Sequence, residues 1–84
     1  MLQLHYFASL RERLGVQQEA FELPVAGMSV GQFIEHLLSQ RGPTWESLQD
    51  AQRVLVAVDK TIVERSHVLH GNEEIAFFPP MTGG

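Results

Sequence analysis

The sequence predicts an α+β fold, in which helices pack on one face of a mixed β-sheet. Segments with strand patterns occur near both ends and in the second half of the chain, and stretches with helical spacing separate the early ones. The chain has 84 residues, of which 44% are hydrophobic and 19% are charged. That length and composition suit one small domain.

The first quarter of the chain predicts strand, short helix and strand. Residues 2–6 alternate apolar and polar side chains, which indicates a half-buried strand. Residues 7–14 change to helical spacing, with Phe7 on the apolar stripe, and Gly15 is a natural helix stop. We expect a second strand over residues 19–23.

The clearest helix begins at Ser29. Its hydroxyl can cap the free amides of the first turn, and Gln32, three residues later, completes a capping box. Gly42-Pro43 ends this helix. Trp45 and Leu48 are expected to form a short helical turn that holds the next loop against the core.

The remaining strands come from the second half. Residues 53–58 are nearly all apolar, which predicts a central strand buried on both faces. Asp59-Lys60 then forms a turn into a short strand at 61–63, and residues 70–72 form a second turn. Residues 74–78 are the last strand.

This order favours the ubiquitin-like β-grasp among small α+β folds, ahead of a ferredoxin-like split βαβ arrangement. The β-grasp domain is expected to cover residues 1–78, and residues 79–84 to form a flexible tail ending in Gly-Gly.

Composition excludes several functions. Lys and Arg total six, do not cluster, and leave a net charge of −4, so a nucleic-acid binder is not expected. The absence of cysteine removes thiol chemistry. His67 and His70 are the only close histidines and lack partners for a metal site. No signal or membrane-spanning segment is recognised, which predicts a soluble, cytoplasmic protein.

The last strand carries a candidate interface. Alternation places Ile75 and Phe77 on the core face, so Phe78 is expected to point away from the core. We expect it to lie next to Ile62 on the neighbouring short strand. An aromatic beside an aliphatic side chain on an open face can mark a surface for a partner.

The tail has an unusual composition. Pro79-Pro80 stiffens the exit from the last strand. Gly83-Gly84 has no side chains and can enter a channel too narrow for other residues. The last group is the carboxylate of Gly84.

The tail Phe-Phe-Pro-Pro-Met-Thr-Gly-Gly resembles the end of the small subunit of molybdopterin synthase, the MoaD family. Residues 7–12 with Gly15 resemble the first strand-to-helix segment of that family, and residues 56–60 resemble its central strand and turn. Residues 70–75 resemble its Asp-Gly-Asp-Glu turn, with His70 and Asn72 in place of acidic residues.

The resemblance implies a sulfur carrier. In this family, a partner adenylyltransferase related to ubiquitin-activating enzymes adenylates the terminal glycine, here Gly84, with ATP and magnesium. Sulfur then replaces one oxygen to give a thiocarboxylate. The tail is inserted into the large synthase subunit, where its sulfur passes to a cyclic pyranopterin monophosphate during molybdenum cofactor biosynthesis.

The same resemblance assigns roles along the chain. Pro79, Pro80, Met81, Thr82 and Gly83 would thread the tail. Phe78 and Ile62 match hydrophobic positions that pack on the large subunit, and two small with two large subunits form a heterotetramer. The chain itself would bind no cofactor or metal, and the partners would supply the catalytic groups.

Three alternatives remain open. A thiamine-pathway sulfur carrier shares the fold and the Gly-Gly end, but such carriers normally lack the element Phe78-Pro79-Pro80. A ubiquitin-like protein modifier is a different class, in which the single Lys60 would allow at most one self-link. The last alternative is an interaction domain with a passive tail.

Overall fold

A computed structural model describes residues 1–80. Five strands form one sheet with the order β2-β1-β5-β3-β4. These strands are β1 (Leu2–Tyr6), β2 (Gln18–Phe21), β3 (Leu55–Val58), β4 (Thr61–Val63) and β5 (Glu74–Phe78). β1 and β5 pair in parallel, whereas the other neighbours pair antiparallel. The sheet is therefore mixed, as predicted.

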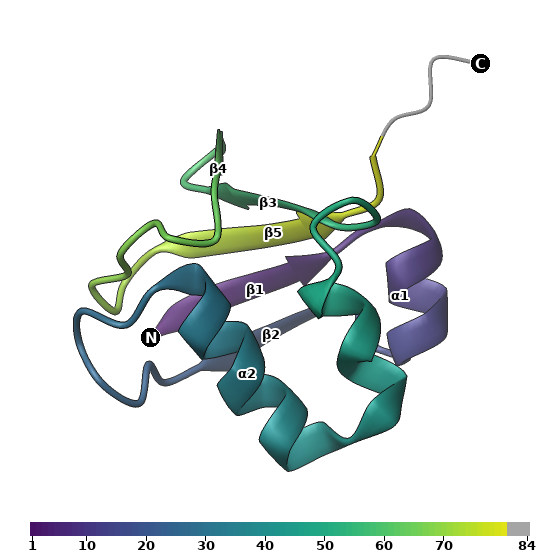
Figure 1. Ribbon diagram of the computed structural model, residues 1–84, viewed down its shortest axis with the longest axis horizontal. Coiled ribbons are helices and arrows are strands. Elements are labelled where there is room, and N and C mark those ends of the chain that lie inside the picture. Colours follow the sequence, from purple (N-terminus) through teal and green to yellow (C-terminus); the bar gives the residue numbers. More distant parts are fainter. Residues whose placement is uncertain (81–84) are drawn as a thin grey trace.

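The helices α1 (Ala8–Leu14), α2 (Val30–Arg41) and the 3-10 helix η1 (Pro43–Gln49) all lie on one face of the sheet (Figure 1). The core fills the space between these two layers. Its largest fully buried side chains are Tyr6, Phe33, Phe77, Leu2, Leu4, Ile34, Leu37, Leu48, Leu69 and Ile75. The predicted α+β architecture is thus confirmed.

Local sequence signals explain most element boundaries. The hydroxyl of Ser29 accepts a hydrogen bond from the Gln32 N–H (3.1 Å), and the Gln32 side chain accepts one from the Ser29 N–H (2.9 Å), which completes the predicted capping box. Gly15 ends α1 with a φ of 74°, a left-handed conformation that glycine adopts without strain. Trp45 and Leu48 are buried in η1, as expected.

Three expectations need correction. The second strand ends at Phe21 rather than at residue 23, and β3 begins at Leu55 rather than at residue 53. β3 is otherwise as predicted: it lies inside the sheet between β5 and β4, with Val56, Ala57 and Val58 buried, although β5 holds the middle position. Phe7 occupies the N-cap position of α1 in an extended conformation instead of joining the apolar stripe of the helix, and 47% of its surface is exposed.

A polar network joins two strands and one helix beside the core. The Tyr6 hydroxyl donates to Glu19 Oε2 (2.9 Å), and the Arg41 guanidinium donates to both Glu19 oxygens (2.6 and 2.7 Å). The same guanidinium lies over the ring of Trp45, 4.6 Å from its centroid. Arg41 thereby fixes the end of α2 against β2.

Candidate functional site

The tail leaves the sheet from β5, the middle strand (Figure 1). β5 is hydrogen-bonded on both sides, and the N–H of Phe7 extends the contact with β1 by donating to the Phe77 carbonyl (3.0 Å). Pro79 is half-buried and Pro80 is exposed. The root of the tail is therefore anchored in the best-supported strand of the sheet.

The rest of the tail lies outside the described residues. The roles expected for Met81, Thr82, Gly83 and Gly84 accordingly stay predictions. The roles expected for Pro79 and Pro80 in threading stay predictions as well, although both residues follow directly from the fixed end of β5.

The sheet face opposite the helices carries an apolar surface, here called the outer-face strip. It consists of Phe7, Leu55, Ala57, Ile62, Ala76 and Phe78. The register places Leu55 beside Phe78, and Ala57 between Ala76 and Ile62. Phe7 continues the face of β1 on which its neighbour His5 lies, since their rings stack with centroids 6.3 Å apart. No helix in residues 1–80 covers this face (Figure 1).

The two side chains expected at an interface both belong to this strip. Ile75 and Phe77 are fully buried in the core, which leaves Phe78 on the opposite face, where it is half-buried. Ile62 is 62% exposed. Their role in binding a partner stays a prediction, but their shared face makes one contact surface geometrically possible.

Phe78 and Ile62 are not neighbours, contrary to expectation. β3 separates their strands, and Leu55 and Ala57 lie between them. Sequence reasoning missed these two residues because it treated the run 53–58 as buried on both faces. Val56 and Val58 belong to the core cluster, and Leu55 and Ala57 alternate with them on the opposite face, where Leu55 is half-buried and Ala57 is only 7% exposed.

Polar groups border the outer-face strip where β5 begins. His5 Nε2 lies 3.6 Å from the Glu74 carboxylate, and the Glu74 N–H donates to Asp59 Oδ1 (3.0 Å). Glu73 points the other way and is buried. Its carboxylate accepts hydrogen bonds from the N–H groups of His70, Gly71 and Asn72 at 2.7 to 3.1 Å.

The hydrogen bonds to Glu73 explain the direction of its pKa shift. Burial raises the pKa of the Glu73 carboxyl, but the backbone N–H groups of residues 70–72 together outweigh burial and hold the pKa below its ordinary value. This carboxylate closes the turn before β5, and its hydrogen-bonding capacity is taken up inside the fold. It is therefore a structural group rather than a candidate acid or base.

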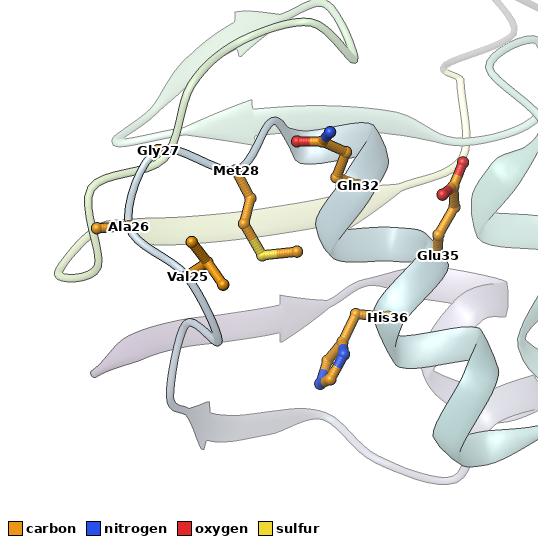
Figure 2. A pocket seen from close by; sticks show the side chains of 7 residues that line it. All are labelled: Val25, Ala26, Gly27, Met28, Gln32, Glu35 and His36. Atoms are coloured by element: carbon orange, nitrogen blue, oxygen red, sulfur yellow. The ribbon is translucent and has the colours of Figure 1, made fainter.

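A hollow of about 550 Å³ lies between the β2–α2 loop and the first turns of α2 (Figure 2). Glu35 and His36 line it, but Figure 2 shows their side chains pointing in different directions. Gln32, also on its wall, is engaged in the capping box. The β2–α2 loop that borders the hollow lies at the opposite end of the sheet from the end of β5 (Figure 1), and the walls of the hollow offer no paired acid and base.

The described residues hold little chemistry of their own. Within residues 1–80, no group of three or more His, Cys, Asp or Glu side chains could hold a metal ion. None of the helices in that range combines the length and apolar character that crossing a bilayer requires. What residues 1–80 provide is an anchored tail root next to an open apolar face.

A mixed sheet with this strand order, helices on one face and a C-terminal segment leaving the middle strand defines the ubiquitin-like β-grasp class. The chain belongs to the ThiS family, whose model matches residues 4–84.

Two bacterial relatives match over the full length of both chains. Each is named as a molybdopterin synthase sulfur carrier subunit: one from Haemophilus influenzae is 36% identical, and one from Escherichia coli is 34% identical. This chain is thus similar throughout to proteins of the MoaD branch, as its tail suggested.

Solved structures share the fold. A Pyrococcus furiosus protein named for subunit 1 of a molybdopterin converting factor superposes with a TM-score of 0.74 at 26% identity, covering 95% of this chain and 97% of that one. Small archaeal modifier protein 1 from Haloferax volcanii superposes with a TM-score of 0.77 at 21% identity, covering 95% and 97%. At that identity, the archaeal modifier shows the fold alone.

Proposed function

We propose that this chain is the sulfur carrier subunit of a molybdopterin synthase. The observation that carries the proposal is the full-length similarity, at 34–36% identity, to two proteins named for that role. The fold supports it, because the tail root is fixed in β5 and the outer-face strip beside it is open to a partner.

The chemistry proceeds at the Gly84 carboxylate. An ionised carboxylate is a poor electrophile, since its ordinary pKa is near ~3.5 and it carries a negative charge at neutral pH. In an activating partner of the ubiquitin-activating type, the carboxylate attacks the α-phosphorus of ATP and releases pyrophosphate. The product is an acyl-adenylate with AMP as its leaving group.

Hydrosulfide, delivered by a sulfur donor, then attacks the acyl carbon, the bond to AMP breaks, and the tail ends in a thiocarboxylate. In the large synthase subunit, the thiocarboxylate sulfur attacks the cyclic pyranopterin monophosphate, and water later restores the Gly84 carboxylate. A dithiolene contains two sulfur atoms, so two loaded carriers are consumed for each molecule of molybdopterin. This requirement is consistent with a heterotetramer of two small and two large subunits.

This chain positions the tail and keeps the space around the Gly84 carboxylate free of side chains. Pro79 and Pro80 direct the tail away from β5, Met81 and Thr82 lengthen it, and Gly83 leaves no side chain next to the reacting group. Phe78 and Ile62 dock on the large subunit. The magnesium and ATP belong to the activating partner, and acid–base groups come from the enzymes that receive the tail.

The decisive experiment measures the intact mass of the chain after incubation with its activating enzyme, ATP, magnesium and a sulfur donor. We expect one oxygen atom to be exchanged for sulfur, and a variant lacking Gly83-Gly84 to show no exchange. Loaded chain mixed with a large subunit and the pyranopterin should then yield molybdopterin. If the full-length chain acquires no sulfur, the proposal is wrong.

A thiamine-pathway carrier is the second candidate, because the matching family model is that of ThiS. The loaded chain should bind a molybdopterin synthase large subunit and should not transfer sulfur to a thiazole-forming synthase. The reverse result would assign the chain to the thiamine pathway. A mass increase equal to a lysine-linked target protein would instead indicate a protein modifier.

A further inference from the structure

A second, smaller cavity lies at the root of the tail. It has a volume of about 160 Å³ and is bordered by α1, η1, the loop before β3 and Pro79. Its polar lining consists of Arg13 and Ser9 from α1, Ser47 from η1 and Arg53 from the loop. Figure 1 shows these segments converging where the chain leaves β5.

The charge at this cavity differs from that of the molecule. The chain carries ten acidic and six basic residues, yet both ionisable side chains on the cavity wall are arginines, and no carboxylate lines it. Two of the other basic residues are engaged elsewhere: Arg41 binds Glu19, and Arg65 donates to the Val54 carbonyl (2.8 Å). The cavity is therefore a local cationic site on an acidic protein.

Within residues 1–80, the polar groups around the cavity have few hydrogen-bond or ion-pair partners. No ion pair to Arg13 is present among residues 1–80. Arg53 Nε lies 3.4 Å from Asp50 Oδ2, but Arg53 is 79% exposed, and an exposed pair of this kind holds its partner weakly. The Ser47 hydroxyl oxygen is buried and has no hydrogen-bond partner in this range.

The size of the cavity restricts its occupant. Small-molecule pockets usually span about 300–1,000 Å³, and this cavity is well below that range. A volume of 160 Å³ matches the space of about five water molecules in the liquid. It admits a single carboxylate or oxyanion group between two guanidinium groups, but not a nucleotide or a pterin.

We propose that this cavity, hereafter the tail-root cavity, receives an aspartate or glutamate side chain of the partner protein that takes up the tail. Arg13 and Arg53 bind the carboxylate, and the Ser9 and Ser47 hydroxyls complete its hydrogen bonds. This inference rests on the proposed function. A partner seated on the outer-face strip and enclosing the tail must pass Pro79, which forms one wall of the cavity.

The anchor complements the outer-face strip. Apolar packing at Phe78 and Ile62 supplies contact area but little orientation, because hydrophobic contacts are not directional. An arginine–carboxylate contact at the root of the tail has a defined geometry. Together the two contacts fix the direction in which the tail enters the partner.

The test is the affinity of the chain for the large synthase subunit, measured by calorimetry for the unmodified chain, Arg13→Gln, Arg53→Gln and the double variant. We expect the double variant to bind at least about tenfold more weakly, as loss of a buried charged contact implies. Lys60→Gln is the matched control: it removes the same charge, but Lys60 lies in the β3–β4 turn, at the other end of β3 from Arg53. Its affinity should stay within about twofold.

The partner's carboxylate is then located by replacing acidic residues of the large subunit one at a time with glutamine. One replacement should show strong coupling to Arg13→Gln or Arg53→Gln in a double-mutant cycle. Arg53→Glu combined with arginine at that partner position should recover affinity. Thermal unfolding of each variant establishes that the domain remains folded.

Several results would overturn the anchor. These are unchanged affinity in the double variant, an equal loss in Lys60→Gln, or no coupled carboxylate on the partner. If inorganic phosphate shifts the amide resonances of Arg13 and Arg53 in the free chain and no partner carboxylate couples to them, the cavity is a free-anion site instead. A chain that acquires sulfur and binds the large subunit independently of both arginines contradicts the anchor alone, whereas failure to acquire sulfur contradicts the proposed function.

Discussion

The backbone of Phe78 belongs to the sheet, and its side chain lies on the face that we propose binds a partner. Phe78 is the last residue of β5, so its backbone completes the pairing with Leu55. Its side chain belongs to the outer-face strip, while its neighbour Phe77 is fully buried in the core. The side chain of Phe78 therefore contributes little to the core and is free to contribute to binding.

Phe78→Ala should weaken binding to the large synthase subunit by about tenfold or more, because a large aromatic side chain near the centre of an interface carries much of the binding energy. The dissociation constant measured by calorimetry tests this. Val25→Ala is the control, because Val25 is also an exposed apolar residue (64%) but lies in the β2–α2 loop, away from the strip. Equal affinity of Phe78→Ala and the unmodified chain would remove Phe78 from the interface.

The turn of the β3–β4 hairpin places two non-glycine residues in a left-handed backbone conformation. Asp59 and Lys60 both have positive φ values, 48° and 72°, as a two-residue type I′ turn requires. The strain at Asp59 is offset by a hydrogen bond, because the Asp59 carboxylate accepts the Glu74 N–H. Lys60 forms no comparable contact among residues 1–80, so its strained conformation is not offset there.

Lys60→Gly should stabilise the domain by a few tenths to about 1 kcal/mol, since glycine adopts the left-handed region without strain but loses more conformational entropy on folding. Chemical denaturation measures the change in the free energy of unfolding. Asp59→Gly is the comparison: it relieves the same kind of strain but removes the bond to Glu74, so it should stabilise less or destabilise. A lower stability of Lys60→Gly would contradict this account of the turn.

At the scale of the whole molecule, two partly or fully buried carboxylates hold the fold together, one across segments that are distant in the sequence and one within a single turn. Glu19 joins β2 to Tyr6 of β1 and to Arg41 of α2, and Glu73 closes the turn before β5. The hydrogen bonds from Arg41 are the main cause that lowers the pKa of Glu19, with burial opposing them. The backbone N–H groups of residues 70–72 lower the pKa of Glu73 against burial.

Both pKa shifts predict that the fold loses stability as the pH falls. A carboxyl whose pKa is lower in the folded state stabilises the fold above its unfolded pKa of about 4.3, and this stability is lost as the pH falls through the folded value. The free energy of unfolding, measured in urea between about pH 7 and about pH 2.5, should therefore decrease with falling pH.

Glu19→Gln and Glu73→Gln should each be less stable at neutral pH and show a shallower decrease, because each removes one titrating group with a lowered pKa. Glu12→Gln provides the matched control, since it removes a charge from an exposed position on α1 without removing a hydrogen bond within residues 1–80. Curves for the glutamine variants that run parallel to that of the unmodified chain would contradict the assigned roles of Glu19 and Glu73.

Local patterns in the sequence determined much of this molecule. The alternation in residues 2–6 and 74–78, the capping box at Ser29 and the turn residues each act within a few positions, so the type and approximate limits of the elements follow from the chain itself. The composition of the tail directed attention to Gly84 for the same reason, because its distinguishing residues are contiguous.

Only the tertiary structure decided how distant segments meet. The insertion of β3 between β5 and β4 separates Phe78 from Ile62 and brings Leu55 and Ala57 into the outer-face strip. Strand order depends on which hydrogen-bonded edges come together, and no local period encodes that choice. The same is true of the tail-root cavity, where Arg13 and Arg53, forty positions apart, line one space only because α1 and the loop before β3 pack at the end of β5.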